Sequence, residues 1–529
     1  MGQATVTLYD TTLRDGAQME GISLSVEDKL RIAQRLDQLG VHYIEGGWPG
    51  SNPKDDEFFR QAREIPFEHA ALTAFGSTRR AKGSVENDAN LKGLLDSGAP
   101  VVTIVGKASE MQVTRVLETS LEENLAMVRE SIEYLRAKGR RVIFDAEHFF
   151  DGFAANPDYA LACIRAAGEA GAEYVVLCDT NGGSLPVDVF NATHRAAQEV
   201  RADIGVHCHN DAEVAVANSI AAVQAGASQV QGTINGYGER CGNTNLLSVI
   251  GNLKLKLGID CVSDEQLERL TEMHRFVAEV ANMPPNRYQA YVGESAFSHK
   301  GGLHASATAK VESAYQHVEP QLIGNAKHVV VSELSGRGNL VMKLREEGLE
   351  DIVSKERLTE LVELVKQREA EGYQYEGAEA SFRLLVQRAL EGYKPPFDLV
   401  DFLVVMEKRR RSAAAEGDDQ ALSEAMVKVR VGGQLAHTVA EGNGPVNALD
   451  LALRRALEQS YPQLSAVSLT DYKVRVVEQG PAGTGAVVRV LVQSTDGERS
   501  WSTVGASGNI IEASWQALTD SLEYALLAR

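Results

Sequence analysis

Two histidines, His207 and His209, stand two residues apart where a short apolar segment ends. On a β-strand the side chains of such a pair point to the same face, so both imidazoles can approach one point. Neutral imidazole is a common ligand of divalent metals, and the pair therefore suggests a metal ion. The competing interpretation is a strand end whose histidines make only structural hydrogen bonds. The pair alone does not decide between them.

Polar clusters also follow most of the other segments that have a strand pattern. These clusters contain carboxylates, amides and an arginine, which are groups that bind metals or handle protons. They occupy residues 10–16, 45, 145–148, 179–182, 207–211 and 235–243. A fold that brings all of these strand ends to one rim would form a single reactive site.

The elements that must position these groups repeat between residues 5 and 258 as a strand, a polar turn and an amphipathic helix. The spacing of Ser25 and Asp28 is typical of a capping box that starts a helix over 25–39. Eight such units fit a closed (β/α)8 TIM barrel better than the alternative, an open doubly wound sheet. The predicted strands are 6–9, 43–46, 70–74, 101–105, 141–144, 174–178, 205–208 and 229–233.

Closing the barrel makes the seventh, eighth and first strands neighbours. Asp15, His207, His209 and Asn243 are then expected to approach one another, which lowers the weight of the purely structural interpretation. Two imidazoles, a carboxylate and an amide oxygen suit Mn²⁺ or Zn²⁺, or Mg²⁺ if water fills most positions. Such an ion would act as a Lewis acid on an oxygen of a bound substrate.

Arg14 and Glu147 are the further candidates for chemistry at this rim. Arg14 would face developing negative charge or a substrate carboxylate, and the alternative is a salt bridge at the barrel mouth. Glu147 could transfer protons if its surroundings raise its pKa, and the alternative is a solvated rim carboxylate.

The strand and helix rhythm stops after residue 260. A mainly helical region follows, with a Gly/His-rich loop at 297–306 and helical patterns at 356–367 and 378–390. A basic and then acidic stretch at 408–419 is interpreted as a linker. From about residue 425, two similar halves each run from strands into a helix, which indicates a regulatory module or a dimerisation domain. The predicted domains are 1–275, 276–415 and 425–529.

Composition places limits on the class of protein. The 529 residues carry a formal net charge of -20, with 44% hydrophobic and 24% charged residues, which is ordinary for a folded protein. The negative charge argues against nucleic acid and anionic membranes as partners. We found no export signal, no apolar run of about 18 residues and no CxxC pair among the five cysteines. A cytoplasmic enzyme with reduced thiols is expected.

Several motifs resemble one known family over essentially the whole chain. The chain is similar to the 2-isopropylmalate, homocitrate and citramalate synthases, and residues 45–54 and 298–304 favour the citramalate branch. The motifs that carry the resemblance are Thr-Thr-Leu-Arg-Asp-Gly at 11–16, His-Cys-His-Asn-Asp at 207–211, Gly-Glu-Arg-Cys-Gly-Asn at 238–243, Gly-Leu-His-Ala at 302–305 and Gly-Asn-Ile-Ile-Glu-Ala-Ser-Trp at 508–515.

The resemblance implies a Claisen-type condensation. Acetyl-CoA loses a methyl proton, the enolate attacks the ketone carbon of a metal-bound 2-oxo acid, and the thioester is hydrolysed. The citramalate branch implies pyruvate as the 2-oxo acid, the first step of a threonine-independent isoleucine route, and feedback inhibition by isoleucine. Ala17 departs from the family, which has an acidic residue there, so the identity of the 2-oxo acid is less certain than the reaction class.

The alternatives differ in substrate or in class. A 2-isopropylmalate synthase would use 2-oxoisovalerate instead of pyruvate. A metal-dependent hydroxyacyl-CoA lyase on the same barrel is disfavoured because such lyases generally stop soon after the barrel. A binding or regulatory protein with a non-catalytic barrel is disfavoured because the set of Asp15, His207, His209 and Arg14 is intact.

The resemblance also implies a role for individual residues. The metal ligands carry over to Asp15, His207 and His209, with Asn243 as an adjacent or fourth ligand. His304, assisted by Glu147, is the expected base, and the family presents the positions of His304 and Tyr315 from a partner subunit, which implies a homodimer. The implied catalytic residues are Arg14, Glu147, His304 and Tyr315, and the implied substrate-binding residues are Arg14, Glu45 and Thr180.

Overall fold

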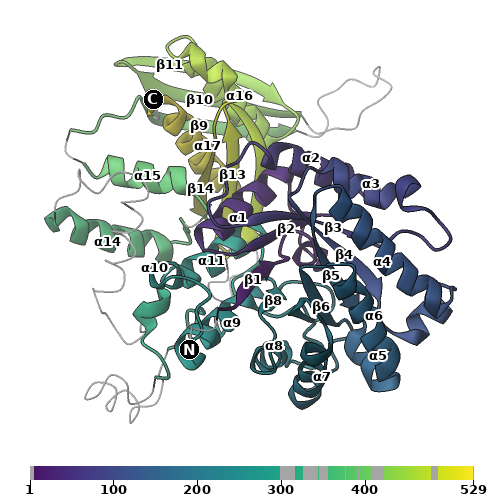
Figure 1. The fold of residues 1–529 in the computed structure, drawn as a ribbon. Coiled ribbons are helices and arrows are strands. Elements are labelled where there is room, and N and C mark those ends of the chain that lie inside the picture. Colours follow the sequence, from purple (N-terminus) through teal and green to yellow (C-terminus); the bar gives the residue numbers. More distant parts are fainter. Residues whose placement is uncertain are drawn as a thin grey trace. The chain divides into compact units, whose positions relative to one another are not determined.

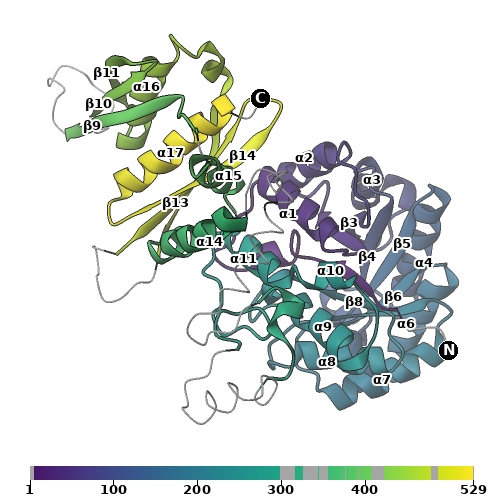
Figure 2. The same cartoon turned by 90° about the vertical axis from the view of Figure 1, so that its left-hand side faces the viewer.

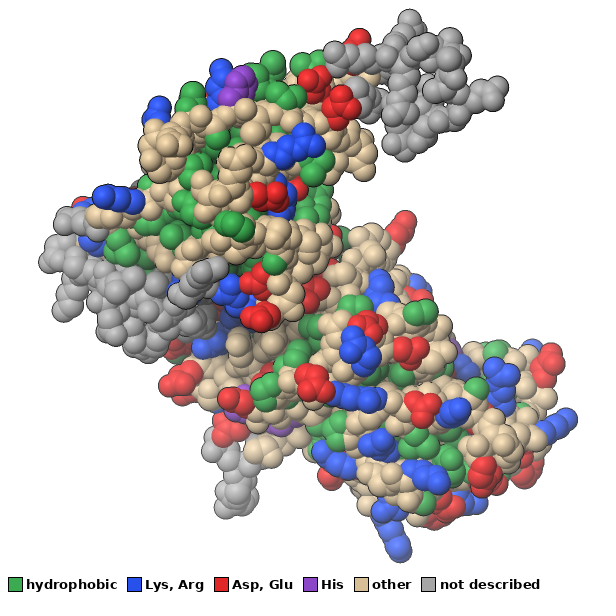
Figure 3. Space-filling model, turned by 90° about the horizontal axis from the view of Figure 1, so that it is seen from above, with side chains coloured by type: hydrophobic (Ala, Val, Ile, Leu, Met, Phe, Trp, Pro, Cys, Tyr) green, Lys and Arg blue, Asp and Glu red, His purple; other side chains and the backbone are tan. Residues whose placement is uncertain are grey.

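The structure is a computed structural model, and it describes residues 5–297, 316–325, 344, 355–375, 377–390, 392–407, 422–477 and 486–527. The chain divides into two compact units, Met1–Ser332 and Glu333–Arg529. Within the described residues, no helix combines the length and apolarity that a membrane crossing requires. On the face drawn in Figure 3, basic and acidic side chains are interspersed, with no basic stripe.

The first unit is a closed barrel of eight parallel strands in sequence order, so the predicted TIM barrel is confirmed (Figure 1). The barrel closes because β1 pairs with both β2 and β8, with Tyr9 opposite Tyr43 on one side and Thr7 opposite Gln229 on the other. The strands are β1 Thr7–Asp10, β2 Tyr43–Gly47, β3 Ala71–Ser77, β4 Val101–Lys107, β5 Arg141–Glu147, β6 Tyr174–Asp179, β7 Asp203–Cys208 and β8 Gln229–Gly232.

Helices surround this barrel, and the first of them has the predicted start. Ser25 Oγ accepts from the backbone N–H of Asp28, and Asp28 Oδ2 accepts from that of Ser25, which completes the capping box. The α-helices are α1 Val26–Gln38, α2 Pro53–Ala62, α3 Ala89–Asp96, α4 Leu121–Ala137, α5 Phe149–Ala155, α6 Pro157–Glu169, α7 Pro186–Glu199, α8 Ala215–Gln224, α9 Leu246–Asn252, α10 Asp264–Leu267 and α11 Leu270–Val280. Short helical turns are η1 Gly16–Gln18, η2 Val85–Asn87, η3 Gln112–Val116, η4 Ile234–Gly236, η5 Leu253–Leu257 and η7 Pro320–Ile323.

The barrel has two apolar layers. The larger layer lies between the strands and the helices, because strand residues alternate between the inside and the outside of the barrel. The smaller layer fills the barrel interior and includes Tyr9, Tyr43, Ile143 and Tyr174. The hydroxyl of Tyr9 lies 2.6 Å from Glu45 Oε2 and 2.7 Å from Thr103 Oγ1, so this interior layer supports the polar residues at the rim.

The second unit contains two antiparallel sheets, in the orders β11-β10-β9 and β12-β13-β14. Helix α16 packs on β10 and β11, and α17 packs on β13 and β14 (Figure 2), so each half has the predicted order of strands and then a helix. The elements are α14 Lys355–Ala370, α15 Glu379–Arg388, β9 Phe397–Glu407, β10 Leu422–Val431, β11 Gln434–Gly442, α16 Pro445–Leu457, η9 Pro462–Ala466, β12 Ser468–Val476, β13 Val488–Thr495, β14 Ser500–Ser507 and α17 Ile510–Leu527.

Strand β9 was missed by the sequence analysis. Its partner β10 lies beyond the predicted linker at 408–419, so the pairing that makes this segment a strand is not local in sequence. Many of its side chains are exposed, including Leu403 and Met406, so its pattern lacks the buried alternation that a strand prediction needs. The linker itself lies outside the described residues.

Candidate active site

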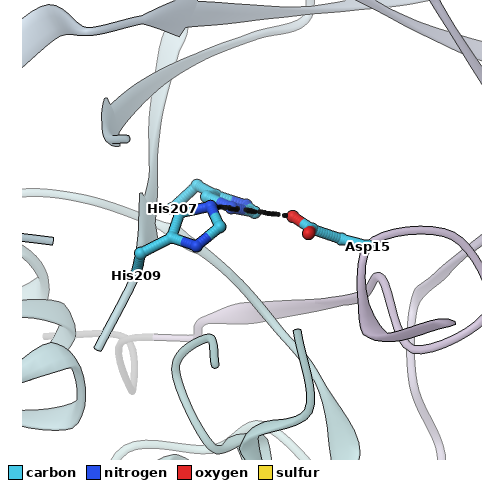
Figure 4. Close-up of side chains that lie close together, drawn as sticks. All are labelled: Asp15, His207 and His209. Carbon is cyan, nitrogen blue, oxygen red and sulfur yellow. Dashed lines mark hydrogen bonds and ion pairs between the residues drawn. The ribbon is translucent and has the colours of Figure 1, made fainter. Parts of the chain in front are cut away.

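Asp15, His207 and His209 converge at the carboxyl ends of β1 and β7 (Figure 4). Asp15 Oδ2 lies 3.3 Å from His207 Nε2 and 3.9 Å from His209 Nε2. The two Nε2 atoms are 3.4 Å apart. One ligand atom from each side chain therefore points at a common centre, and all three side chains are buried.

The loops after β7 and β8 hold His209 beside Asn243. These two residues form an isolated antiparallel bridge, and the backbone N–H of Asn210 donates to the carbonyl of Gly242 at 2.9 Å. Asn243 Nδ2 donates to the carbonyl of Tyr237, whereas Asn243 Oδ1 is buried without a hydrogen-bond partner among the described residues. A buried orphan acceptor beside the cluster fits a role as an additional ligand.

The chemistry of these donors fits a divalent cation. Burial disfavours a charged Asp15, but Arg14 and His207 outweigh burial and hold the pKa of Asp15 well below its usual range. Burial and the neighbouring His207 lower the pKa of His209 to about 4, so its ring is neutral at pH 7. Burial also disfavours a charged His207, but its contact with Asp15 outweighs burial and raises its pKa. A carboxylate and imidazoles are the ligands expected for Mn²⁺ or Zn²⁺.

Arg14 lies against this cluster and is held on three sides. Its Nε donates to Glu45 Oε1 at 2.5 Å, its Nη1 lies 3.5 Å from Asp15 Oδ2, and its guanidinium carbon lies 3.8 Å from the centre of the Phe75 ring. Glu45 is fully buried and also accepts from the hydroxyl of Tyr9. In this structure Glu45 therefore contacts Arg14, and its predicted contact with substrate stays a prediction.

A cavity of about 520 Å³ opens over the cluster and brings most of the predicted residues together. Arg14, Asp15, Glu147, Thr180, His207 and His209 all line it, whereas Glu45 and Asn243 do not. Glu147 forms an ion pair with Lys107, and Thr180 Oγ1 accepts from the backbone N–H of His148 at 2.8 Å. His304 and Tyr315 lie outside the described residues.

Some residues of this cavity were missed by the sequence analysis. Lys107 ends β4, and Arg79 and Arg80 follow β3, so the rule that a barrel's reactive groups lie at strand ends could have found them. Asp145 also lines the cavity, and burial together with the Glu45 carboxylate raises its pKa to about 7. A larger cavity of about 620 Å³ lies beside Arg140 and Arg141, at the opposite ends of the strands, and contains none of the predicted site residues.

Comparison with known proteins covers the barrel and the second unit. Residues 5–277 match the HMGL-like family, residues 291–372 match the homocitrate synthase post-HMGL domain-like family, and residues 376–526 match the LeuA allosteric (dimerisation) domain. These matches lie along the chain in the order barrel, middle region and carboxyl-terminal module.

Curated relatives match over almost the full length. The (R)-citramalate synthase of Aquifex aeolicus is 53% identical, over 99% of this chain and 98% of that protein. The (R)-citramalate synthase of Geobacter sulfurreducens is also 53% identical, over 98% of this chain and 97% of that protein. The 2-isopropylmalate synthase of Methanocaldococcus jannaschii is 29% identical, over 99% of this chain and 95% of that protein. The chain therefore belongs to the (R)-citramalate synthase family, whose barrel is of the HMGL-like type.

Proposed function

We propose that this chain condenses acetyl-CoA with pyruvate to give (R)-citramalate and CoA. The observation that carries the proposal is the convergence of Asp15, His207 and His209 beside Arg14, in a chain 53% identical to named (R)-citramalate synthases over nearly its whole length. The cavity above this cluster has about 520 Å³ of space for substrates.

The proposal includes a divalent cation, Mn²⁺, Zn²⁺ or Mg²⁺, held by Asp15, His207 and His209, with Asn243 as an adjacent or fourth ligand. When bound, such a cation supplies Lewis acidity that polarises the oxygens of a 2-oxo acid. Two observations support this assignment: the three donors converge, and the buried Oδ1 of Asn243 has no hydrogen-bond partner in the described part of the chain. Arg14, beside Asp15, is placed to bind the substrate carboxylate or the oxygen on which negative charge develops.

The reaction forms one carbon–carbon bond. A base removes a methyl proton of acetyl-CoA, the resulting carbanion attacks the ketone carbon of pyruvate, and the former ketone oxygen takes up a proton. Water then cleaves the thioester and releases CoA. We assign the base to His304 assisted by Glu147, which Lys107 holds in an ion pair. Tyr315 and Thr180 are assigned to the catalytic and substrate-binding sets by the same family resemblance.

A substrate panel tests this proposal. Acetyl-CoA is supplied with pyruvate, 2-oxoisovalerate or 2-oxoglutarate, and free CoA thiol is followed over time. We expect the highest kcat/KM with pyruvate and no turnover by Asp15→Ala or His209→Ala. Faster turnover of 2-oxoisovalerate would favour a 2-isopropylmalate synthase, and release of acetyl-CoA from 3-hydroxy-3-methylglutaryl-CoA would favour a lyase.

We propose that the second unit binds isoleucine as a feedback inhibitor and joins two chains in a homodimer. The enzyme is proposed to act in the cytoplasm, in a route to isoleucine. The match of residues 376–526 to the LeuA allosteric (dimerisation) domain supports this assignment. We expect isoleucine to inhibit the full chain while leucine does not. We also expect light scattering to give twice the chain mass.

A further inference from the structure

Gln231, on β8, joins a residue of the proposed metal site to a carboxylate on β5. Its Oε1 lies 3.0 Å from His207 Nδ1, and its Nε2 donates to Asp145 Oδ1 at 3.1 Å. The side chain of Gln231 is fully buried, and His207 and Asp145 are 5% and 3% exposed. The three side chains therefore form a continuous hydrogen-bonded chain inside the barrel.

The order of donors and acceptors in this chain fixes the proton on His207. The NH₂ group of Gln231 donates to Asp145, so its amide oxygen is the atom that faces His207. Nδ1 of His207 must then carry the hydrogen, because a bare ring nitrogen would face a bare oxygen. In the neutral ring, which is the form that binds a metal, the lone pair is then on Nε2, the atom directed at Asp15.

We propose that Gln231 is a positioning residue that, anchored by Asp145, holds His207 in the tautomer that presents Nε2 to the cation. This inference rests on the proposed metal site. A metal-ligating histidine generally donates its other N–H to a carboxylate, a carbonyl or water, which orients the ring and makes the ligand more basic. Here the amide of Gln231 is that acceptor, and Asp145 holds the amide by accepting from its NH₂ group.

The arrangement serves His207 and not His209. Nδ1 of His209 is buried without a hydrogen-bond partner among the described residues. Of the two imidazoles, only that of His207 therefore loses a hydrogen-bond partner when the Gln231 amide is removed.

Gln229 supplies a matched control on the same strand. Residues at i and i+2 of a strand share a face, and Gln229 is fully buried, as Gln231 is. Both polar side-chain atoms of Gln229 lack a partner among the described residues, so it makes no corresponding link to the site. The same substitution at 229 and at 231 therefore separates loss of the link from loss of a buried amide.

The test measures Mn²⁺ binding to the full chain by calorimetry and by the electron paramagnetic resonance signal of free Mn²⁺. Methionine has a similar length and does not accept the His207 N–H strongly. We expect Gln231→Met to weaken Mn²⁺ binding by about 10- to 100-fold, whereas Gln229→Met leaves it unchanged. Equal affinities of Gln231→Met and the wild type would overturn the inference.

A rescue variant distinguishes positioning from packing. Gln231→Glu combined with Asp145→Asn exchanges the carboxylate and the amide, so the acceptor for His207 is kept and the total charge is unchanged. We expect Mn²⁺ affinity within about threefold of the wild type. A loss as large as that of Gln231→Met contradicts the inference, and this variant decides the question if Gln231→Met fails to fold. If Asp15→Ala binds Mn²⁺ as the wild type does, the metal site itself is wrong, which separates the two proposals.

Discussion

Arg14 is the residue with the most specific surroundings in the site. Its guanidinium contacts the carboxylates of Glu45 and Asp15, and its central carbon lies 3.8 Å from the centre of the Phe75 ring. A planar guanidinium can donate in more than one direction while stacking on a ring, whereas an ammonium group cannot do both. The two carboxylates and the aromatic ring therefore favour arginine over lysine at position 14. They also fix the guanidinium, and with it the remaining N–H groups, before substrate binds.

Arg14→Lys tests this selection. We expect kcat to fall by about 100-fold or more, because the donors that face the developing charge would be displaced. Mn²⁺ affinity should change little, since Asp15 keeps its place beside His207. Steady-state assays and metal titration are compared with Arg60→Lys, an exposed control on α2. Unchanged kcat in Arg14→Lys would show that the arginine acts only as a structural ion-pair partner.

Asp10 provides a pH-dependent contribution to stability. Burial raises its pKa to about 7, although hydrogen bonds from the backbone and hydroxyl of Thr12 oppose burial. In the unfolded chain its pKa is about 3.9, so between about pH 4 and 7 the folded state keeps a proton that the unfolded state has released. This group therefore favours folding at low pH, and its contribution is lost as pH rises, by at most about 1.4 kcal/mol per pH unit.

Asp10→Asn removes this titration. We expect the stability of the variant relative to the wild type to increase as pH rises from 5 to about 7.5. Urea unfolding of the metal-free chain at several pH values measures the difference, and Asp56→Asn at an exposed position is the control. A constant difference across this range would mean that Asp10 has the same pKa in both states.

At the scale of elements, a side chain of α1 holds the segment that leads into β3. Asp37, in the last turn of α1, accepts from the backbone N–H groups of Glu68, His69 and Ala70 at 2.9, 2.8 and 2.7 Å. These three residues immediately precede β3, so their N–H groups are bonded to Asp37 before the pairing of β3 begins. One buried side chain therefore replaces strand pairing at the entrance to the strand that carries Phe75.

Asp37→Ala should lower the free energy of unfolding by about 3 kcal/mol, because it removes three hydrogen bonds to one carboxylate. Asp37→Asn keeps one acceptor oxygen and should lie between the alanine variant and the wild type. Urea unfolding followed by circular dichroism measures both. If Asp37→Ala has wild-type stability, water or another acceptor takes over these donors.

The eight barrel strands could be predicted because each is a local apolar segment between a helix and a polar turn. Their ends differ from the prediction where the strand continues into the site, as in β5, which reaches Glu147. Strand β9 could not be predicted, since its pairing with β10 is distant in sequence. The same reason explains why Gln231 was missed. Gln231 is a buried polar residue inside a strand, and its role depends on a contact with Asp145, which is distant in sequence.

At the scale of the whole molecule, the two units carry different chemistry. The barrel unit contains Asp15, His207 and His209, and within the described residues this is the cluster of His, Cys, Asp or Glu side chains able to hold a metal ion. The second unit has paired sheets and helices α16 and α17, and it matches an allosteric domain. Metal and effector are therefore expected to stabilise different parts of one chain.

Hydrogen exchange on the full chain tests this division. A ligand that binds only the folded state raises the free energy of unfolding by RT ln(1 + [L]/Kd). This increase is about 2.7 kcal/mol when the ligand is at 100 times its Kd. Mn²⁺ should slow exchange in peptides from β1, β7 and β8, and a chelator should reverse this effect, whereas isoleucine should slow exchange in peptides from β10 to α17. Asp15→Ala should abolish only the first effect. Protection of the barrel strands by isoleucine in that variant would place the effector in the barrel and contradict the division of roles.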